Sequence, residues 1–235
     1  MPSSLPLTYR FQPPRQVGLG SAPVLVMLHG IGSHEGDLFQ LAPYLDPRLA
    51  VISLRAPIPW SVGGSVGGFA WFEMAWTPEG LVGDPQQARN SLKLLSRFLE
   101  QALPNGIPDI ALDPRQVYLL GFSQGAIMSL YLALTQPEKL AGVVAMSGRL
   151  SPEILAEAVE PERMKHLAIL VVHGTADAVL PIAFGRQIRD YFAPLPLNFT
   201  YREYEMGHEV SPESLRDIQV WLQNLLDRRN LEMKP

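Results

Sequence analysis

Short apolar runs, separated by longer segments with helical periodicity, constrain the fold of this chain most. Each run is nearly continuous in apolar residues, which is typical of strands buried on both faces, as in a parallel sheet. The runs are Val24–Leu28, Ala50–Leu54, Val117–Leu120, Gly142–Met146 and Ala168–Val172. A further run, Phe199–Tyr204, alternates polar and apolar residues and is expected at an edge of the sheet.

Helical start signals occupy the segments between these runs. Asp84-Pro85 combines an N-cap residue with a proline at the first helical position, and Ser151-Pro152 and Ser211-Pro212 repeat this arrangement. Further helices are expected over Ala126–Thr135 and Pro181–Phe192. Strands that alternate with helices predict an α/β fold, in which a mostly parallel central sheet carries helices on both faces.

Length and composition favour one globular domain. The 235 residues are 47% hydrophobic and 18% charged, and no break in composition divides the chain, so we expect a single domain over residues 1–235. The net charge of −4 gives no electrostatic reason for binding nucleic acid or an anionic membrane. The lack of cysteine excludes disulfides, thiolate metal sites and a cysteine nucleophile.

The N-terminal residues Met1–Pro14 contain no basic segment followed by an apolar stretch, so no signal peptide is expected. Apolar runs such as Leu167–Val172 are much shorter than a membrane span. We therefore expect a cytoplasmic protein without stable membrane insertion. The sequence leaves the oligomeric state open, and a homodimer is one alternative.

The segment Gly121-x-Ser123-x-Gly125 lies between an expected strand and an expected helix. In that setting a serine can occupy a sharp strand-to-helix turn that exposes its hydroxyl in a cleft. Glycines on either side relieve the crowding of the backbone. The five-residue pattern alone is common, and the alternative is a glycine-rich loop without chemistry. The strand before it and the helix after it favour a nucleophile.

A serine nucleophile needs a base, an acid that orients the base, and donors for the oxyanion. In the chain order of α/β-hydrolases, an acid and then a histidine follow the serine. His208 is the expected base, because His166 and His173 leave no room for an acid on a separate loop. Asp177 is the expected acid, because it follows a buried strand and lies at the sheet edge of the serine. The alternative for Asp177 is a turn residue or a helix cap.

Two backbone N–H groups are expected to bind the oxyanion. One belongs to Gln124, the residue after the nucleophile, and the other to Ile31, with Gly30 as the second candidate. If only the Gln124 amide matters, replacement of its side chain by alanine costs little activity. His29 is expected to brace the loop His29-Gly30-Ile31-Gly32 rather than to act as a catalyst.

The segment Ala56–Gly83 interrupts the alternation of strands and helices. It is rich in glycine, proline and aromatic residues, and it contains the direct repeat Ser61-Val62-Gly63-Gly64, Ser65-Val66-Gly67-Gly68. Connections of this length without periodicity are usually functional or mobile. We expect a loop over the active site, with Trp71 and Phe72 lining the substrate pocket. The alternative is a loop that packs its aromatic residues on the sheet.

With these segments, the chain resembles the phospholipase/carboxylesterase family of α/β-hydrolases, which includes bacterial carboxylesterases and acyl-protein thioesterases. The matching segments are Leu28-His29-Gly30-Ile31-Gly32, Trp71-Phe72, Gly121-Phe122-Ser123-Gln124-Gly125, His173-Gly174-x-x-Asp177-x-Val179-x-Pro181 and Gly207-His208. The resemblance implies an α/β-hydrolase fold and a triad of Ser123, Asp177 and His208. It also implies an oxyanion hole from the Ile31 and Gln124 amides, and hydrolysis of small acyl esters or thioesters without metal or cofactor.

Two departures from the family pattern concern the substrate rather than the chemistry. Acyl-protein thioesterases usually carry an aspartate soon after His-Gly-x-Gly, where this chain has Ser33-His34-Glu35, and the duplicated Ser-Val-Gly-Gly is longer than the usual loop. Ester, thioester and lysophospholipid substrates all fit. Acyl transfer, peptide hydrolysis and cofactor-free peroxidation remain alternatives, because a fold does not fix a function. A non-catalytic binding module is disfavoured, since no triad member is missing.

Two His-Glu pairs, His34-Glu35 and His208-Glu209, lack the second histidine that a zinc-protease motif needs. The chain also lacks the Gly-x-x-x-x-Gly-Lys pattern of a phosphate-binding loop. The sequence therefore predicts neither a metal nor a cofactor.

Overall fold

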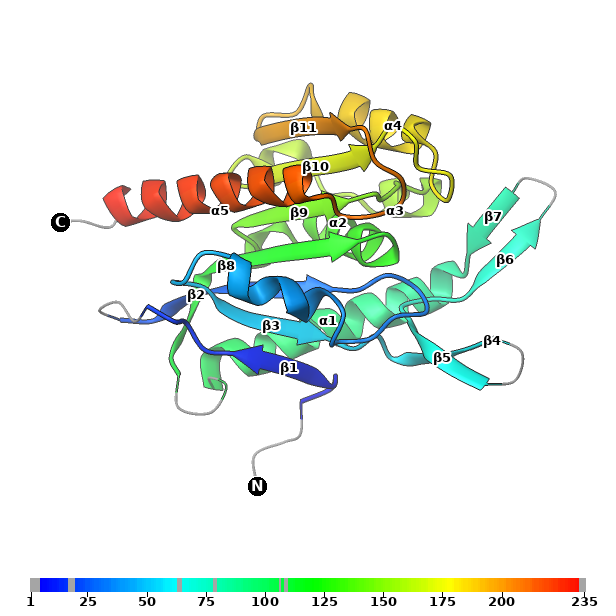
Figure 1. Ribbon diagram of the computed structural model, residues 1–235. Coiled ribbons are helices and arrows are strands. Elements are labelled where there is room, and N and C mark those ends of the chain that lie inside the picture. The colour runs from blue at the N-terminus through cyan, green and yellow to red at the C-terminus, as the bar shows by residue number, and fades with distance from the viewer. Residues whose placement is uncertain are drawn as a thin grey trace.

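A seven-stranded sheet forms the middle of the molecule in the computed structural model, which describes residues 5–16, 20–62, 65–77, 80–105, 107 and 110–232. Its strands are β1 (Tyr9–Gln12), β2 (Ala22–Leu28), β3 (Ala50–Leu54), β8 (Leu112–Phe122), β9 (Gly142–Met146), β10 (Ala168–Gly174) and β11 (Asn198–Tyr204). Their order is β1-β3-β2-β8-β9-β10-β11 (Figure 1). Only β1 runs antiparallel to its neighbour. The predicted mostly parallel sheet is confirmed, with β11 at an edge.

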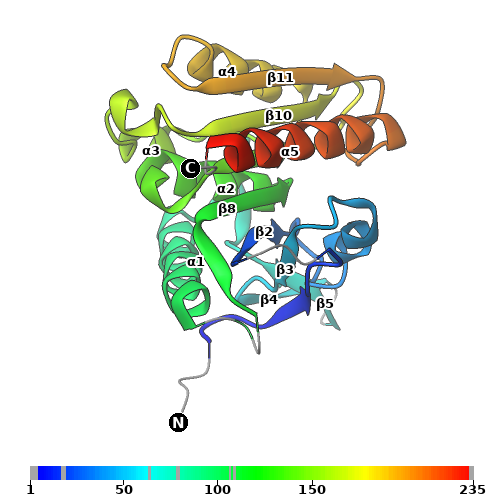
Figure 2. The ribbon, with the colours of Figure 1, turned by 90° about the vertical axis from the view of Figure 1, so that its left-hand side faces the viewer.

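Helices cover both faces of this sheet. They are α1 (Pro85–Asn105), α2 (Gln124–Thr135), α3 (Pro152–Ala156), α4 (Ile182–Phe192) and α5 (Pro212–Glu232), with short 3₁₀ helices η1 (Leu38–Tyr44), η2 (Pro137–Lys139) and η3 (Pro161–Met164). Figure 2 shows α1 and α5 on opposite sides of the sheet. No helix in the described part of the chain is long and apolar enough to cross a membrane.

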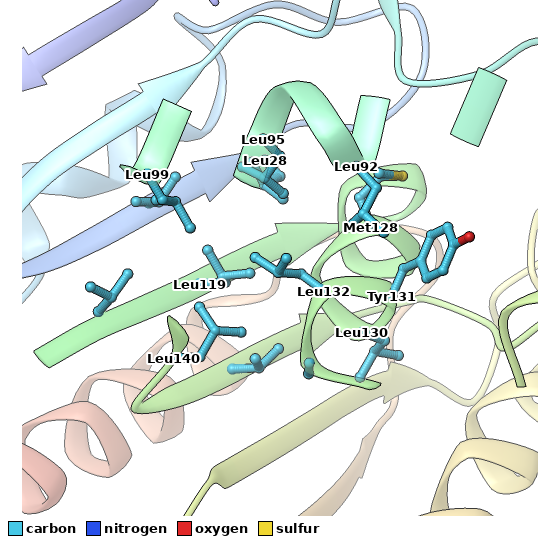
Figure 3. Close-up of a cluster of buried hydrophobic side chains, with 14 of the residues drawn as sticks. Leu28, Leu92, Leu95, Leu99, Leu119, Met128, Leu130, Tyr131, Leu132 and Leu140 are labelled. Carbon is cyan, nitrogen blue, oxygen red and sulfur yellow. The ribbon is translucent and has the colours of Figure 1, made fainter. Parts of the chain in front are cut away.

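The strands separate two apolar clusters, which explains their continuous apolarity. In β2, Val26 and Leu28 face the cluster that contains α1, α2 and α4, while Leu25 and Met27 face the cluster that contains α5. Successive side chains of a strand point to opposite faces, so a strand covered on both sides needs apolar residues at every position. Figure 3 shows the first cluster, where leucines of α1 and α2 pack over β2 and β8.

The predicted helix starts are confirmed for α1, α3 and α5, each of which begins at its proline. The Asp84 carboxylate accepts hydrogen bonds from the N–H groups of Gln86 (2.8 Å) and Gln87 (3.0 Å). The hydroxyl of Ser211 accepts one from the Ser214 N–H (3.1 Å). These side chains satisfy N–H groups that have no acceptor within the helix.

The segment Ala56–Gly83 is not the irregular loop that its composition predicts. It forms two antiparallel ribbons, β4 (Ile58–Val62) with β5 (Ser65–Ala70) and β6 (Met74–Thr77) with β7 (Gly80–Gly83). Both ribbons lie at the end of the molecule toward which the parallel strands point (Figure 1). Gly63 and Gly64 of the direct repeat lie outside the described residues.

The strand order fixes where a site can form. From β2 the chain passes to β3 on one side, and it later enters β8 on the other side of β2. Ligands of open α/β sheets bind outside the carboxyl ends of the strands at such a reversal of direction. The loop after Leu28 and the turn after Phe122 both emerge at this point.

Candidate active site

Ser123 occupies a sharp turn between β8 and α2. Its φ of 53° lies in the left-handed region, where residues other than glycine are rare and strained. The Ser123 N–H donates to the carbonyl of Met146 in the neighbouring strand β9 (2.9 Å), which ties the turn to the sheet. Because α2 begins at Gln124, the N–H of that residue has no acceptor within the helix. The serine therefore stands at a helix N-terminus that offers a free amide.

Close approaches of the backbone require the two glycines of this turn. A Cβ at position 125 would lie 1.9 Å from the carbonyl oxygen of Leu28 in β2. A Cβ at position 121 would lie 2.3 Å from the carbonyl oxygen of Gly125. A side chain at either position would push α2 away from the sheet. The crowding expected from the sequence is thus real, and it comes from β2 and α2.

Asp177 and His208 meet at the same edge of the sheet. Nδ1 of His208 lies 2.7 Å from Oδ2 of Asp177. The ring of His208 packs on the ring of Phe122, the residue before Ser123, with 4.9 Å between the ring centroids. A carboxylate only accepts hydrogen bonds, so the Nδ1–H donates, and in the neutral ring Nε2 is then the free acceptor. The three residues predicted as a triad therefore lie at one edge, with a histidine tautomer that can accept a proton.

Asp177 stays ionised although it is only 5% exposed. Its Oδ1 accepts hydrogen bonds from the N–H groups of Val179 (2.9 Å) and Leu180 (2.8 Å). Burial, the largest influence, raises the pKa of the carboxyl, but the bonds from His208 and these two amides together hold the pKa below its ordinary value. One oxygen therefore shapes the turn while the other orients the histidine, so both roles considered for Asp177 apply.

His173 supports the Asp177 loop, which the sequence did not reveal. Its ring is fully buried, and Nε2 lies 2.7 Å from the carbonyl oxygen of Leu180 but 3.6 Å from Oδ2 of Asp177. The longer distance exceeds that of a hydrogen bond, so the Nε2–H donates to the carbonyl. The available signal was the position of His173-Gly174 at the end of β10, three residues before the acid.

The loop after β2 packs against the serine. A Cβ at Gly30 would lie 3.3 Å from Cβ of Ser123. The carbonyl of Gly30 accepts hydrogen bonds from Nδ1–H of His29 (2.7 Å) and from the N–H of Ser33 (3.2 Å). In a trans peptide the N–H points opposite to the C=O, so these bonds also fix the direction of the Ile31 N–H. Among the described residues, that N–H has no acceptor.

His29 braces this loop as a neutral ring. Its Nε2 accepts a hydrogen bond from the N–H of Ala56 (3.1 Å), so the proton resides on Nδ1. Burial, above all other influences, lowers the pKa of the imidazole. The ring therefore links the loop after β2 to the chain that follows β3.

Both polar atoms of the Gln124 side chain form hydrogen bonds. The residue is 3% exposed, its Oε1 accepts from the N–H of Trp71 (2.7 Å), and its Nε2 donates to the carbonyl of Phe72 (2.7 Å). The expectation that alanine at this position costs little no longer follows. Sequence reasoning missed these bonds because their partners lie far away along the chain.

Trp71 and Phe72, predicted together as pocket residues, take different places. Trp71 is fully buried, and its indole Nε1–H donates to the carbonyl of His29 (3.0 Å). Phe72 lines a cavity of about 690 Å³. Of the two residues, Phe72 lines this cavity and Trp71 does not.

Neither Ser123 nor Asp177 lines the cavity, but residues close to both of them along the chain do. Its lining includes Ile127, whose N–H donates to the Ser123 carbonyl (3.1 Å), and residues 178–180, which follow Asp177 directly. The volume suits a small organic ligand. Most of the lining is apolar, but Arg149 joins it with its guanidinium 5.8 Å from the ring centroid of Phe184. In the described part of the chain, no three histidine or acidic side chains gather as metal ligands.

Glu35, in the segment that departs from the family pattern, forms a bidentate ion pair. Nε and Nη2 of Arg55 each lie 2.6 Å from a carboxylate oxygen of Glu35. The Arg55 guanidinium also lies 4.6 Å from the ring centroid of Phe69 in β5. The pair therefore ties the loop after β2 to the end of β3 and to a ribbon.

Replacement of Glu35 by glutamine is expected to lower the free energy of unfolding by about 2 kcal/mol at pH 7, as for a hydrogen bond to a charged group. The hydrogen-bonded Arg55 lowers the pKa of Glu35 from 4.5 to about 2. The stabilisation is therefore present above pH 4.5 and disappears as the pH falls toward 2. Urea unfolding at several pH values measures this difference between wild type and variant.

The matched control is Glu138→Gln, which alters an exposed pair with Arg163 (3.0 Å). Its effect should stay below about 1 kcal/mol. Equal stability of the Glu35 variant and the wild type at pH 7 would contradict the prediction.

Comparisons with known proteins agree along nearly the whole chain. A family model described as Phospholipase/Carboxylesterase matches residues 18–226. Acyl-protein thioesterase 1 of Saccharomyces cerevisiae is 28% identical over 237 residues, covering 95% of this chain and 99% of that protein. The protein of the same name from Kluyveromyces lactis is 28% identical over 215 residues, covering 86% and 92%.

Solved structures share the fold. The esterase PE8 has a TM-score of 0.76 at 25% identity, covering 93% of this chain and 99% of that one. The Bacillus cereus carboxylesterase has a TM-score of 0.79 at 21% identity, covering 95% and 96%. The sheet and its helices therefore follow an architecture seen in known esterases.

Proposed function

The chain belongs to the phospholipase/carboxylesterase family of serine hydrolases, and on that premise we propose that it hydrolyses acyl esters and thioesters through an acyl-Ser123 intermediate. The observation that carries the proposal is the 2.7 Å bond between Asp177 and His208, at the sheet edge where Ser123 follows the last residue of β8. Two relatives are named acyl-protein thioesterases, which supports the inclusion of thioesters.

In the first half of the reaction, Oγ of Ser123 attacks the acyl carbonyl carbon. Nε2 of His208 takes the hydroxyl proton, and Asp177 stabilises the resulting imidazolium. The N–H groups of Ile31 and Gln124 donate to the oxyanion, where preorganised donors lower the barrier most. His208 then gives the proton to the departing alcohol or thiol as the carbon–oxygen or carbon–sulfur bond breaks.

In the second half, water replaces the alcohol or thiol. His208 accepts a proton from this water as its oxygen attacks the acyl carbon. The same two amides hold the second oxyanion. Collapse then breaks the bond to Oγ of Ser123, which regains its proton from His208, and releases a carboxylic acid.

The cavity beside the serine is the place for the acyl chain. Phe72 and Ile127 supply apolar walls close to the turn, and Leu180 supplies one close to the acid. An apolar pocket of this size favours a chain over a polar group, because burial of apolar surface drives its binding.

Hydrolysis of matched acyl series, from acetyl to palmitoyl, tests the function. The same chains are supplied as p-nitrophenyl esters and as alkyl thioesters, and the released alcohol, thiol and acid are measured. We expect turnover of both series and labelling of Ser123 by a fluorophosphonate, detected by peptide mass spectrometry. A protein that hydrolyses neither series, or that is labelled elsewhere, would refute the proposal.

Replacement of Ala88 by phenylalanine tests the acyl pocket. Ala88 lines the cavity from α1 and is 7% exposed. A phenyl ring there fills space, so kcat/KM for the longest chains should fall by about tenfold or more, the scale of discrimination in apolar pockets. Acetyl ester turnover serves as the internal control and should change little. An unaltered chain-length profile in a folded variant would rule this pocket out.

A further inference from the structure

The buried hydrogen bonds around Trp71 connect the two segments that carry the oxyanion amides. The Gln124 side chain clamps the backbone of residues 71 and 72, with 2.7 Å to the Trp71 N–H and 2.7 Å to the Phe72 carbonyl. The indole of Trp71 then donates to the carbonyl of His29 (3.0 Å). A continuous path thus runs from the first residue of α2 to the loop after β2.

This path ends at the two peptide groups whose N–H groups, those of Gly30 and Ile31, are the candidate oxyanion donors. A hydrogen bond to the carbonyl of His29 sets the plane of the His29–Gly30 peptide and therefore the direction of the Gly30 N–H. The His29 ring, bonded to the Gly30 carbonyl (2.7 Å), does the same for the Ile31 N–H. Both candidate donors of this loop are therefore held through their carbonyl oxygens.

Helix α1 also holds the residue that the Gln124 side chain contacts. The Trp71 carbonyl accepts a hydrogen bond from the Ser91 hydroxyl of α1 (2.5 Å). The indole is fully buried and packs near the His29 ring, with 5.9 Å between centroids. Because these groups are buried, loss of one hydrogen bond leaves its partner unsatisfied, and the neighbouring groups move to find another.

We propose that the Gln124 side chain is a positioning residue for the oxyanion hole: through Trp71 it holds the His29–Ile31 loop in register with the amide of Gln124 itself. The proposal rests on the proposed function, because it assigns a task to the side chain of a residue whose amide binds the oxyanion. The same side chain holds Phe72 in the cavity wall, so one residue ties the acyl pocket to the oxyanion hole.

Gln124→Met tests the clamp by removing both hydrogen bonds at similar side-chain length. Misplacement of catalytic groups by about 1 Å costs on the order of 10²-fold, so we expect kcat to fall by about 10- to 100-fold with little change in KM. Affinity for an alkyl boronic acid, which adds to Ser123 as a tetrahedral mimic, should fall by a similar factor. Thermal unfolding and circular dichroism verify the fold.

Two further variants separate positioning from packing. Trp71→Phe keeps a ring but removes the Nε1–H bonded to His29, and it should lower kcat and boronate affinity in the same way. If both side chains act in one path, the double variant with Gln124→Met and Trp71→Phe should lose less kcat than the product of the two single fold-losses. Should the Gln124→Met variant fail to fold, Trp71→Phe carries the test alone.

Gln124→Glu provides a pH-dependent rescue. Its carboxylate still accepts from the Trp71 N–H but meets the Phe72 carbonyl without a proton to donate. Protonation restores a donor, so activity relative to wild type at the same pH should rise as the pH is lowered. A purely structural loss would leave this ratio flat.

Gln116→Met is the matched control. Gln116 is another buried glutamine, 6% exposed, whose Nε2 donates to Asp113 (3.0 Å) near the start of β8, at the far end of that strand from Ser123. It should lower stability and leave kcat unchanged. A folded Gln124→Met variant with wild-type kcat and boronate affinity, or one that alters only KM, would overturn the proposal. Failure of the proposed function itself would appear earlier, as wild-type protein without Ser123-dependent turnover.

Discussion

Replacement of Ser123 by alanine is expected to reduce hydrolysis of p-nitrophenyl esters by about 10⁶-fold, as loss of the nucleophile does in serine proteases. The N–H groups proposed to bind the oxyanion remain, so a small acceleration over the uncatalysed reaction should persist. Turnover and burst amplitude, measured with purified protein, check the result.

The structure indicates that this variant keeps its fold. The Ser123 hydroxyl makes no capping bond to α2, so its removal leaves the helix start unchanged. Alanine faces the same backbone strain at a φ of 53° as serine does. The melting temperature should therefore stay close to that of the wild type.

Ser129→Ala supplies the matched control for this experiment. Ser129 lies later in α2, is fully buried, and donates to the carbonyl of Gly125 (2.8 Å). Its loss should affect stability rather than turnover. Near-normal turnover of the Ser123 variant would show that another residue is the nucleophile.

The strands of the inner sheet could be predicted from the sequence because of where they lie. Strands covered on both faces require apolar residues at each position, and Ala50–Leu54 and Gly142–Met146 coincide with β3 and β9. β1 was missed because it is short, polar at Arg10 and Gln12, and paired antiparallel at an edge. The ribbons were missed because their residues show no regular alternation of apolar and polar types. Ser61, for example, pairs with Val66.

In the active site, too, some features could be predicted from the sequence and others could not. Chain order suggested Asp177 and His208, because the ends of parallel strands meet at one edge whatever the details of packing. The bonds from Gln124 to residues 71 and 72 join segments about 50 positions apart, as the separations of 53 and 52 show. No local pattern marks such contacts. The cavity likewise gathers residues of four helices and a ribbon, so only Phe72 was found in advance.

Replacement of Asp177 by asparagine is expected to lower kcat by about 10⁴-fold, as the same change does in a serine protease. The backbone N–H groups of Val179 and Leu180 bind Oδ1 at 2.9 and 2.8 Å, so the amide oxygen of asparagine must occupy that place. The NH₂ group then faces Nδ1 of His208 and donates to it. His208 would carry its proton on Nε2 and could not accept one from Ser123.

Because the two backbone bonds survive, the Asp177→Asn variant should remain folded and keep its KM. Asp113→Asn is the matched control, since Asp113 is 2% exposed, accepts the Arg115 N–H (2.9 Å), and lies near the start of β8. It should lower stability without lowering kcat. The hydrogen bonds from His208 and the two amides hold the pKa of Asp177 below its ordinary value, so the wild-type pH profile near neutrality should not report its protonation. Turnover of the Asp177 variant within tenfold of the wild type would mean that another group orients His208.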